Sequence, residues 1–345
     1  EAKKIVANKT ILVTGGGGSI GSELCCQIVK LRPSKLIILE RNEFNLYKIE
    51  QLLNNTFVEV EFVLGDVCES ESVNNVLEKY TPEIIFHAAA YKHVPILEKN
   101  AREAIKNNIL GTKTIADMAI RHNCKKFILI STDKAVNPTN VLGASKRIAE
   151  LYVENINQSS STNFSTVRFG NVLDSDGSVV PLFRSQILNG GPVTVTNPEI
   201  TRYFMTIGEA CQLILQASKI ATGGEIFILD MGAPVKINYL AEQMIRLSGL
   251  VPNKDISIQF SGLRPGEKMY EELFYETEAI EKTTHSKILL AKHTTLDQSE
   301  FTIKINAIID ACNNFNNTKI RELLKDLVPF FDSTKNNTVP IDKKA

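Results

Sequence analysis

The sequence predicts an α/β fold in which a doubly wound parallel sheet is joined to a smaller α/β domain. Two observations predict it. Short β-branched runs alternate with amphipathic stretches through the first half of the 345-residue chain, which is the pattern of repeated β-α-β units. In addition, a glycine-rich run from Thr14 to Gly21 follows the first expected strand and opens the first expected helix. This combination is typical of a Rossmann-type sheet.

The expected strands are short and almost entirely apolar, as in parallel strands that helices cover on both faces. They span residues 10–13, 36–39, 60–64, 84–87, 127–130 and 165–168. The first helix is expected to place Ile20, Leu24, Ile28 and Leu31 on one face, because these apolar positions recur with helical spacing. We therefore expect residues 1–170 to form a dinucleotide-binding domain.

Turn-rich sequence replaces this rhythm after about residue 170. Helices are expected at residues 207–221 and 237–247. Residues 171–332 are expected to form most of the second domain, with some strands or helices returning to the first. Polar residues 333–345 are expected to form a flexible tail.

The composition excludes several classes of protein and favours a small-molecule ligand. The 39 basic and 39 acidic side chains cancel, so no broad electrostatic field favours nucleic acid or an anionic membrane surface. The six cysteines lack metal-binding spacing, and no metal site is expected. No apolar run approaches the roughly 20 residues that span a bilayer, which predicts a cytoplasmic chain without membrane contact of its own. Because the chain starts at Glu1 and not at methionine, a membrane anchor in a longer parent protein remains an alternative.

Three glycines in the glycine-rich run are spaced three residues apart, at Gly15, Gly18 and Gly21. A tight turn, close approach of the backbone to a pyrophosphate and helix-to-strand packing each exclude a Cβ, while the helix N-terminus attracts the phosphate charge. Ser19 and Ile20 begin this helix and are expected to contact the same cofactor. The run therefore predicts a dinucleotide site.

The expected cofactor is NAD. Glu40 ends the second expected strand, nineteen residues after Gly21, where a carboxylate accepts hydrogen bonds from ribose hydroxyls. Arg41 follows and suits a 2′-phosphate, so NADP remains the alternative. The other expected cofactor contacts follow the third and fourth strands and are Asp66, Val67, Ala88 and Ala89.

Five motifs carry a resemblance to a known superfamily. They are residues 14–21, residues 87–95, residues 131–134 with 138–140, residues 168–172 and residues 264–268. In this order they resemble the extended short-chain dehydrogenases/reductases, and among these the nucleotide-sugar 4,6-dehydratases. The resemblance covers about residues 9–273. It is strongest to the UDP-N-acetylglucosamine 4,6-dehydratases of the long, membrane-anchored kind, which act in bacterial surface-polysaccharide synthesis.

The Tyr-x-x-x-Lys pair of this superfamily is incomplete here. Lys146 is present, but Leu142 stands where the tyrosine is expected. In the long dehydratases methionine typically replaces this tyrosine, and leucine preserves size and apolarity. The chain therefore resembles the tyrosine-less branch, and Tyr91 as a displaced phenol is an alternative interpretation.

The resemblance implies a reaction in three stages. Oxidation at sugar carbon C4 passes a hydride to NAD and makes the C5 hydrogen acidic, the C6 hydroxyl leaves, and the hydride returns to C6. Asp133 is expected to protonate the departing oxygen and a neutral Lys134 to remove the C5 proton, since burial lowers the pKa of a lysine. Thr132 is expected beside the C4 oxygen and Lys146 at the nicotinamide ribose. The expected acceptor of the C4 proton is Asp133 or a water molecule ordered by Thr132 and Lys146.

The same resemblance places a uridine nucleotide mainly in residues 171–332. The implied substrate contacts are Lys92 and His93 at the sugar, Asn171, Ser178, Val179, Arg202 and Arg264 at the diphosphate, and Glu267 near the uridine ribose. An ordinary loop position is an equally good interpretation of His93.

Two other functions remain as alternatives. A nucleotide-sugar 4-epimerase shares the scaffold but keeps the C6 oxygen, so it has no elimination for Asp133 and Lys134 to assist. A non-catalytic nicotinamide-binding regulator has no need of a lysine-rich pocket. Relatives commonly pair through two long helices, here residues 102–122 and 143–158, which implies a homodimer or a higher homo-oligomer.

Overall fold

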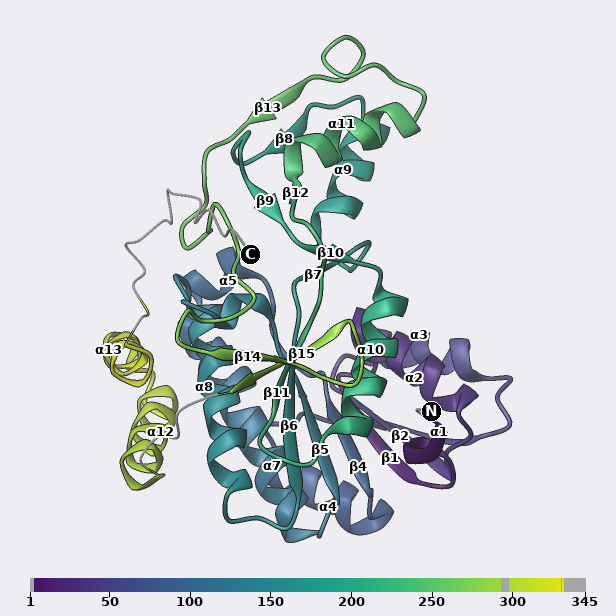
Figure 1. Ribbon diagram of the computed structural model, residues 1–345, viewed down its shortest axis with the longest axis vertical. Helices are drawn as coiled ribbons and strands as arrows, with labels where there is room; N and C mark the ends of the chain where they lie inside the picture. The colour runs from purple at the N-terminus through teal and green to yellow at the C-terminus, as the bar shows by residue number, and fades with distance from the viewer. Residues whose placement is uncertain (1–2, 293–297, 330, 332–345) are drawn as a thin grey trace.

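The computed structural model describes residues 3–292, 298–329 and 331, so the expected tail at 333–345 lies outside the described residues. A large lobe is built around a sheet, and a smaller lobe lies above it (Figure 1). The sheet has nine strands in the order β14-β15-β11-β6-β5-β4-β1-β2-β3. The strands from β11 to β3 pair in parallel, whereas β15 pairs antiparallel with β11 and with β14. Their bounds are Thr10–Thr14 (β1), Lys35–Glu40 (β2), Glu59–Leu64 (β3), Ile84–His87 (β4), Lys126–Ile130 (β5), Asn163–Arg168 (β6), Ile226–Leu229 (β11), Ala279–Lys282 (β14) and Ile288–Lys292 (β15).

The strand order β3-β2-β1-β4-β5-β6 is that of a Rossmann-type sheet, and the predicted fold class is confirmed. The six strands expected in the first half are present, with ends that differ from the expected ones by at most two residues. β3 departs from the expected burial because it is the outer strand. Its residues are half-buried or exposed, and Leu64 is 58% exposed.

Helices cover both faces of this sheet. Alternate residues of β1 point to opposite faces, so Ile11 and Val13 pack with α2, α3 and α10, whereas Leu12 packs with α4, α7 and α8. The helices of the sheet lobe are Lys3–Val6 (α1), Ser19–Lys30 (α2), Glu43–Leu53 (α3), Ser70–Tyr80 (α4), Val94–Lys99 (α5), Ala101–Ala104 (α6), Gly111–Arg121 (α7), Val141–Asn157 (α8) and Ile207–Ile220 (α10). A short 3₁₀ turn, Asp133–Ala135, follows β5.

The long helix expected at residues 102–122 has a π-helical segment, Ile105–Leu110, between α6 and α7. Most of this segment's side chains are buried. Asn108 within it accepts a hydrogen bond from the Tyr91 amide and donates one to the Ser145 hydroxyl at 3.0 Å. The altered helical turn therefore ties the loop after β4 to the start of α8.

Two C-terminal helices, Gln298–Asn313 (α12) and Asn317–Leu327 (α13), pack beside α8 (Figure 1). Apolar residues such as Phe301 and Leu324 form a common core with Ile105 and Ile148. These helices cover the face through which relatives are expected to pair. The homodimer and the helices through which it would form stay predictions.

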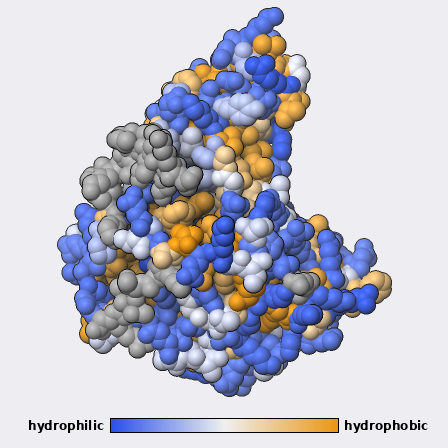
Figure 2. All heavy atoms as spheres, in the orientation of Figure 1, coloured by the Kyte–Doolittle hydropathy of each residue, from blue (hydrophilic) through white to orange (hydrophobic). Residues whose placement is uncertain are grey.

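The smaller lobe has its own core. It contains Val179–Leu188 (α9), Val193–Val195 (β8), Thr201–Arg202 (β9), Val235–Lys236 (β12), Ile237–Leu247 (α11) and Ile258–Phe260 (β13). β8 pairs with β13 and β9 with β12, and Phe183, Ile245 and Ile256 are buried between the strands and helices. Two short strands, Asn171–Val172 (β7) and Phe204–Met205 (β10), pair in parallel and connect the lobes. Figure 2 shows hydrophobic residues at the junction of the two lobes.

Candidate active site

A cavity of about 720 Å³ lies where the two lobes meet. Its walls come from the carboxyl ends of β1, β4 and β5 and from the smaller lobe, which is where open α/β sheets bind ligands. A second cavity of about 250 Å³ shares Gly15, Gly18, Ala88 and Tyr91 with the first and continues toward the end of β2. Together they can accommodate a molecule that extends from the edge of the sheet to the smaller lobe.

The three glycines predicted from their spacing have different surroundings. A Cβ at Gly15, where φ is +66°, would lie 2.6 Å from the Ala89 Cα, and a Cβ at Gly21 would lie 2.1 Å from the Gly15 oxygen. Gly18 has more room, since its nearest such contact is 3.4 Å, and it faces both cavities. Gly15 and Gly21 are therefore required by packing, while Gly18 exposes bare backbone to the cavities. Ser19 and Ile20 line the larger cavity at the start of α2.

Glu40 lies at the end of β2 in the wall of the smaller cavity. Its carboxylate accepts hydrogen bonds from the amides of Gly17 at 3.1 Å and Asn42 at 2.9 Å. The Arg41 guanidinium lies over the Tyr91 ring at 4.4 Å and 3.5 Å from an Asp66 carboxylate oxygen. Glu40 is thus fixed at the cavity wall, whereas Arg41 is engaged by two neighbours.

Of the four remaining residues expected at the cofactor, three line the cavities and Asp66 lines neither. Val67 and Ala89 line the smaller one and Ala88 lines both. Asp66 accepts a hydrogen bond from the Cys68 amide at 2.9 Å. Burial raises the pKa of Asp66, but this bond and Arg41 outweigh burial and the pKa is lowered.

Thr132, Asp133 and Lys134 follow β5 and form one hydrogen-bonded group. The Thr132 hydroxyl and the Lys134 ammonium each donate to Oδ1 of Asp133 at 2.9 Å, and Lys134 also donates to Oδ1 of Asn171 at 3.0 Å. Thr132, Lys134 and Asn171 line the larger cavity. Asp133 is fully buried behind them and is not among the residues that line it.

The pKa of Asp133 is shifted in the direction expected for a proton donor, whereas the pKa of Lys134 is shifted against expectation. Burial raises the pKa of Asp133, Lys134 lowers it, and Glu271 raises it, so that the pKa is raised overall. Burial lowers the pKa of Lys134, but the attraction of Asp133 and Glu271 outweighs burial and the pKa is raised. The expectation of a lysine kept neutral by burial alone is therefore not met, because two carboxylates lie beside it.

Lys146 projects from α8 into the same cavity. Its ammonium donates to the Ile130 carbonyl at 2.7 Å. Burial lowers the pKa of Lys146 to about 8, with Glu150 opposing the change. Leu142, one helical turn earlier, is buried and also lines the cavity, but it offers no group that can accept a proton.

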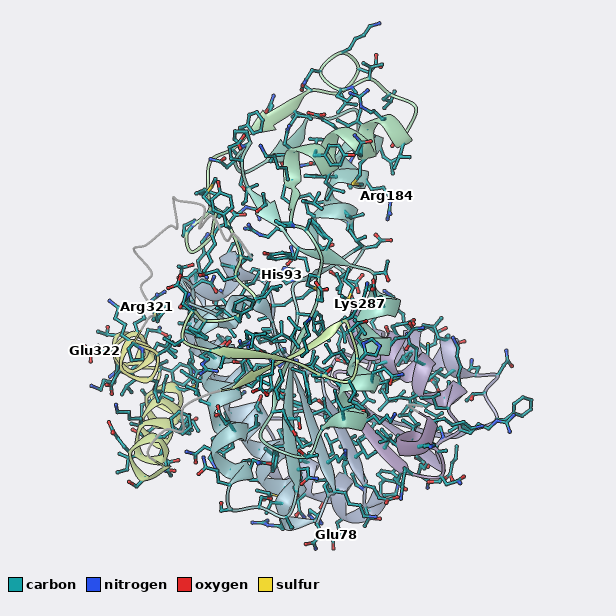
Figure 3. The ribbon with its side chains drawn as sticks, in the orientation of Figure 1. Glu78, His93, Arg184, Lys287, Arg321 and Glu322 are labelled. Atoms are coloured by element: carbon teal, nitrogen blue, oxygen red, sulfur yellow. The ribbon has the colours of Figure 1, made fainter. Side chains whose placement is uncertain are left out.

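Four of the residues expected at the sugar and diphosphate lie near the N-terminus of α9 and the adjacent loop after β4: Ser178, Val179, Lys92 and His93. Ser178 precedes this helix, and its hydroxyl oxygen is buried without a hydrogen-bond partner among the described residues. Val179, Lys92 and His93 line the cavity with it, and Figure 3 shows His93 between the two lobes. A Cβ at Gly177 would lie 2.5 Å from the His93 ring, so the two loops are closely packed. Burial lowers the pKa of Lys92 and of His93, with Asp176 opposing the change at Lys92.

Arg202 and Arg264 have different environments, although both line the cavity. The Arg202 guanidinium donates to the carbonyl oxygens of Thr201 at 2.6 Å, Lys268 at 2.8 Å and Met269 at 3.3 Å. It is therefore engaged in holding the backbone, which favours a positioning role over the expected phosphate contact. Arg264 is exposed, and its side chain is better placed to meet a phosphate.

A segment from Gly266 to Tyr275 links the smaller lobe to the loop after β5. Lys268 donates to the Val136 carbonyl at 2.8 Å, and the Tyr275 hydroxyl donates to the Ala135 carbonyl at 2.7 Å. Asn140 donates to the Gly266 carbonyl at 3.0 Å. We call residues 266–275 the linking segment.

Gly266, Lys268, Glu271 and Thr196 line the cavity in this region and were not predicted as site residues. Glu271 lies in the linking segment, is buried and lines the cavity beside Lys134. Thr196 lines the cavity as well and donates to Glu267 at 3.2 Å, while Glu267 also accepts from the Arg264 amide at 3.0 Å. The only sequence signal for Glu271 is its place in an acidic pair shortly after the Arg-Pro-Gly-Glu-Lys motif.

The fold and these side chains define an extended short-chain dehydrogenase/reductase. A sequence profile described as "Polysaccharide biosynthesis protein" matches residues 11–293, and the chain belongs to this family. It is 51% identical to the capsular polysaccharide biosynthesis protein CapD of Staphylococcus aureus over 92% of this chain and 53% of CapD. The chain thus spans about half the length of that relative.

Other relatives carry two different activities in their names. The chain is 35% identical to a UDP-N-acetylglucosamine 4,6-dehydratase (inverting) of Campylobacter jejuni, with 76% of each chain covered. It is 36% identical to a UDP-glucose 4-epimerase of Rickettsia rickettsii, with 77% of each chain covered. The X-ray structure of Pen from Bacillus thuringiensis superimposes with a TM-score of 0.77 at 32% identity, covering 88% of this chain and 99% of Pen. These similarities support an enzyme of the nucleotide-sugar dehydratase or epimerase type.

Within residues 3–292 and 298–329, no helix is both long and apolar enough to cross a bilayer. Over the same described residues, His, Cys, Asp and Glu side chains form no group of three or more that could hold a metal ion.

Proposed function

We propose that this chain is an NAD-dependent 4,6-dehydratase that converts UDP-N-acetylglucosamine to the UDP-4-keto-6-deoxy sugar for surface glycan synthesis. The observation that carries the proposal is the hydrogen-bonded group of Thr132, Asp133 and Lys134, in which Thr132 and Lys134 line a cavity that Lys146 also lines and Asp133 lies behind them. Relatives of nearly equal similarity are named as a dehydratase and as an epimerase, so the site has to discriminate between them. An acid and a base beside the sugar serve an elimination, which an epimerase does not perform.

The smaller cavity fits the adenosine half of NAD. Gly18 leaves open the space that a pyrophosphate needs, and the Glu40 carboxylate is fixed where ribose hydroxyls can donate to it. The same negative charge repels a 2′-phosphate, which favours NAD over NADP, and Arg41 is already engaged by Tyr91 and Asp66. Bound there, NAD would supply the hydride chemistry, by which a hydride leaves C4 of the sugar and later returns to C6. Lys146, which lines the larger cavity, would hold the nicotinamide ribose.

The proposed route for the C4 proton runs through Thr132 to Asp133. Thr132 lines the cavity, and its hydroxyl already donates to Asp133, which lies behind it. As the C4 hydroxyl gives its proton to Oγ1, Thr132 passes its own proton to the Asp133 carboxylate. This favours Asp133, reached through Thr132, over the alternative of a water molecule, and it needs no tyrosine at Leu142.

In the elimination, the proton moves back along the path through Asp133 and Thr132, and Lys134 acts as the base. Asp133 now carries a proton and returns it through Thr132 to the departing C6 oxygen, which leaves as water. Lys134 takes the C5 proton from its place in the cavity wall. The proton of the C4 hydroxyl thus ends in water, and C5 regains a proton when the hydride reaches C6.

The uridine nucleotide is proposed to lie against the smaller lobe. Ser178 and the first amides of α9 would contact the diphosphate, and Arg264 would supply a cation. The spare hydroxyl of Ser178 supports this placement, because buried polar groups normally have a partner.

The direct test is incubation with UDP-N-acetylglucosamine and NAD, followed by proton NMR of the product. A methyl signal at C6 together with a keto or hydrated C4 is expected. A product that keeps its C6 hydroxymethyl group and has inverted at C4 would show an epimerase. Unchanged substrate, with NAD bound, would favour the non-catalytic regulator and refute the proposal.

A further inference from the structure

Glu271 is a buried carboxylate in the cavity wall to which the route above gives no role. Its Oε1 lies 3.5 Å from the Lys134 ammonium and 3.7 Å from Nε of Arg202. Its Oε2 is buried and has no hydrogen-bond partner within the described part of the chain. Oδ2 of the neighbouring Asp133 is likewise buried without a partner within the described residues, and such atoms are uncommon because most buried polar atoms are satisfied.

The surroundings of Lys134 create a need for such a group. Its ammonium faces acceptor oxygens of Asp133 at 2.9 Å, Asn171 at 3.0 Å and Glu271 at 3.5 Å. An ammonium has three hydrogens to match three acceptors, whereas a neutral amine would turn its lone pair toward one of them. Lys134 is therefore charged at rest, yet it must be neutral to take the C5 proton. Asp133 cannot relieve it, because Asp133 receives the C4 proton through Thr132.

We propose that Glu271 is a positioning residue that holds the Lys134 ammonium at the cavity wall and accepts one of its protons before the elimination. This inference rests on the function proposed above. The N–H bond of Lys134 breaks and an O–H bond forms on Glu271, which leaves a lone pair on Nζ. That lone pair takes the C5 proton, the C5–H electrons form the C5–C6 double bond, and the C6–O bond breaks as Asp133 supplies its proton. When the hydride reaches C6, Lys134 returns a proton to C5 and Glu271 returns the stored proton to Nζ.

The charges around the pair set the order of these events. Asp133, Glu271 and Arg202 face Lys134, while Lys134, Arg202 and Lys268 face Glu271. Burial raises the pKa of Glu271, but these three cations outweigh it and lower the pKa, so Glu271 is ionised at rest. Uptake of the C4 proton removes the charge of Asp133, one of the two carboxylates that raise the pKa of Lys134. Oxidation at C4 therefore lowers the pKa of Lys134 from its raised resting value and reduces the cost of moving its proton to Glu271.

The test compares Glu271→Gln and Glu271→Asp with Glu276→Gln, an exposed glutamate just beyond the linking segment. Each protein is loaded with NAD and mixed with UDP-N-acetylglucosamine. E271Q is expected to lower kcat by roughly 100-fold with little change in KM, because it removes one proton-transfer step. The absorbance of the reduced nicotinamide should build up in E271Q, since oxidation proceeds and elimination stalls. Its kcat should also rise with pH where that of the wild type is level, because solvent must then take the proton from Lys134.

E271D keeps the carboxylate but withdraws it by one methylene, so an intermediate kcat is expected, and E276Q should match the wild type. Wild-type kcat and pH profile in E271Q would overturn the inference. The inference would also be overturned if E271Q and E271D lost turnover equally, accumulated no reduced nicotinamide and did not recover at high pH. That pattern would indicate a structural role for Glu271. If E271Q does not fold, the inference is tested with E271D, by the absorbance of reduced nicotinamide and by the pH dependence of kcat. Failure of the wild type to form the 4-keto-6-deoxy product would instead refute the proposed function.

Discussion

Replacing Lys146 with methionine should make the protein more stable while abolishing its activity. Lys146 is buried, and burial lowers its pKa from 10.5 to about 8. Each pKa unit corresponds to about 1.4 kcal/mol, so burying this ammonium costs the folded protein roughly 3 kcal/mol below pH 8. Methionine has a similar length and no charge, but it leaves the Ile130 carbonyl without its 2.7 Å hydrogen bond, a loss of roughly 1 kcal/mol. The expected net gain at pH 7 is roughly 2 kcal/mol.

The sign of the pH dependence distinguishes this cause from better packing. Because the pKa is lower in the folded state, the cost is present in full below pH 8 and disappears as the pH rises toward 10.5. Urea unfolding of the nucleotide-free proteins at pH 7 and in the alkaline range should therefore show an advantage of K146M that shrinks as the pH rises. Lys99→Met, at an exposed position, is the control and should show neither effect. A K146M protein that is less stable than the wild type at pH 7, or an advantage independent of pH, would refute this reasoning.

Three further changes test other parts of the site. Thr132→Val should lower kcat by roughly 100-fold because it removes the route to Asp133, whereas Thr132→Ser should retain most of the turnover, and equal rates for the two would contradict that route. Glu40→Gln should weaken NAD binding by about 10-fold and narrow its preference over NADP, measured by calorimetry, since the charge that repels a 2′-phosphate is gone. Arg168→Met should destabilise the protein by roughly 3–5 kcal/mol, because the buried carboxylates of Glu150 and Glu278 lose their shared guanidinium. If urea unfolding shows that the free energy of unfolding falls by less than about 1 kcal/mol, other groups compensate the buried charges of Glu150 and Glu278.

Features set by short-range rules could be predicted from the sequence. The strands around Ile11 and Ile38 follow from apolar runs between turn residues, and the sheet order follows from the β-α-β rhythm. The glycine run predicted a tight turn, and the positions of Gly15 and Gly21 show why no side chain fits there. Glu40 was found from its distance along the chain because the strand and helix between it and Gly21 have typical lengths.

Features that depend on contacts between distant segments could not be predicted. The charge of Lys134 was expected from burial alone, but its pKa is raised by the adjacent Asp133 and also by Glu271, which the linking segment brings from the other lobe. The role expected for Arg202 changed for the same reason, because its partners are carbonyl groups of that segment. The covering of α8 by α12 and α13 also depends on where the chain returns after the sheet, which no local pattern records.

The linking segment has a consequence for any attempt to change the sugar specificity by exchanging lobes between relatives. Lys268 and Tyr275 anchor it to the carbonyls of Val136 and Ala135, although its chain enters from the smaller lobe. A chimera cut before Gly266 would keep these contacts native, whereas a chimera cut after Tyr275 would place a foreign linking segment on the native loop after β5. Donor lobes that include the linking segment must therefore be grafted together with the loop after β5, so that both sides of this contact come from one parent.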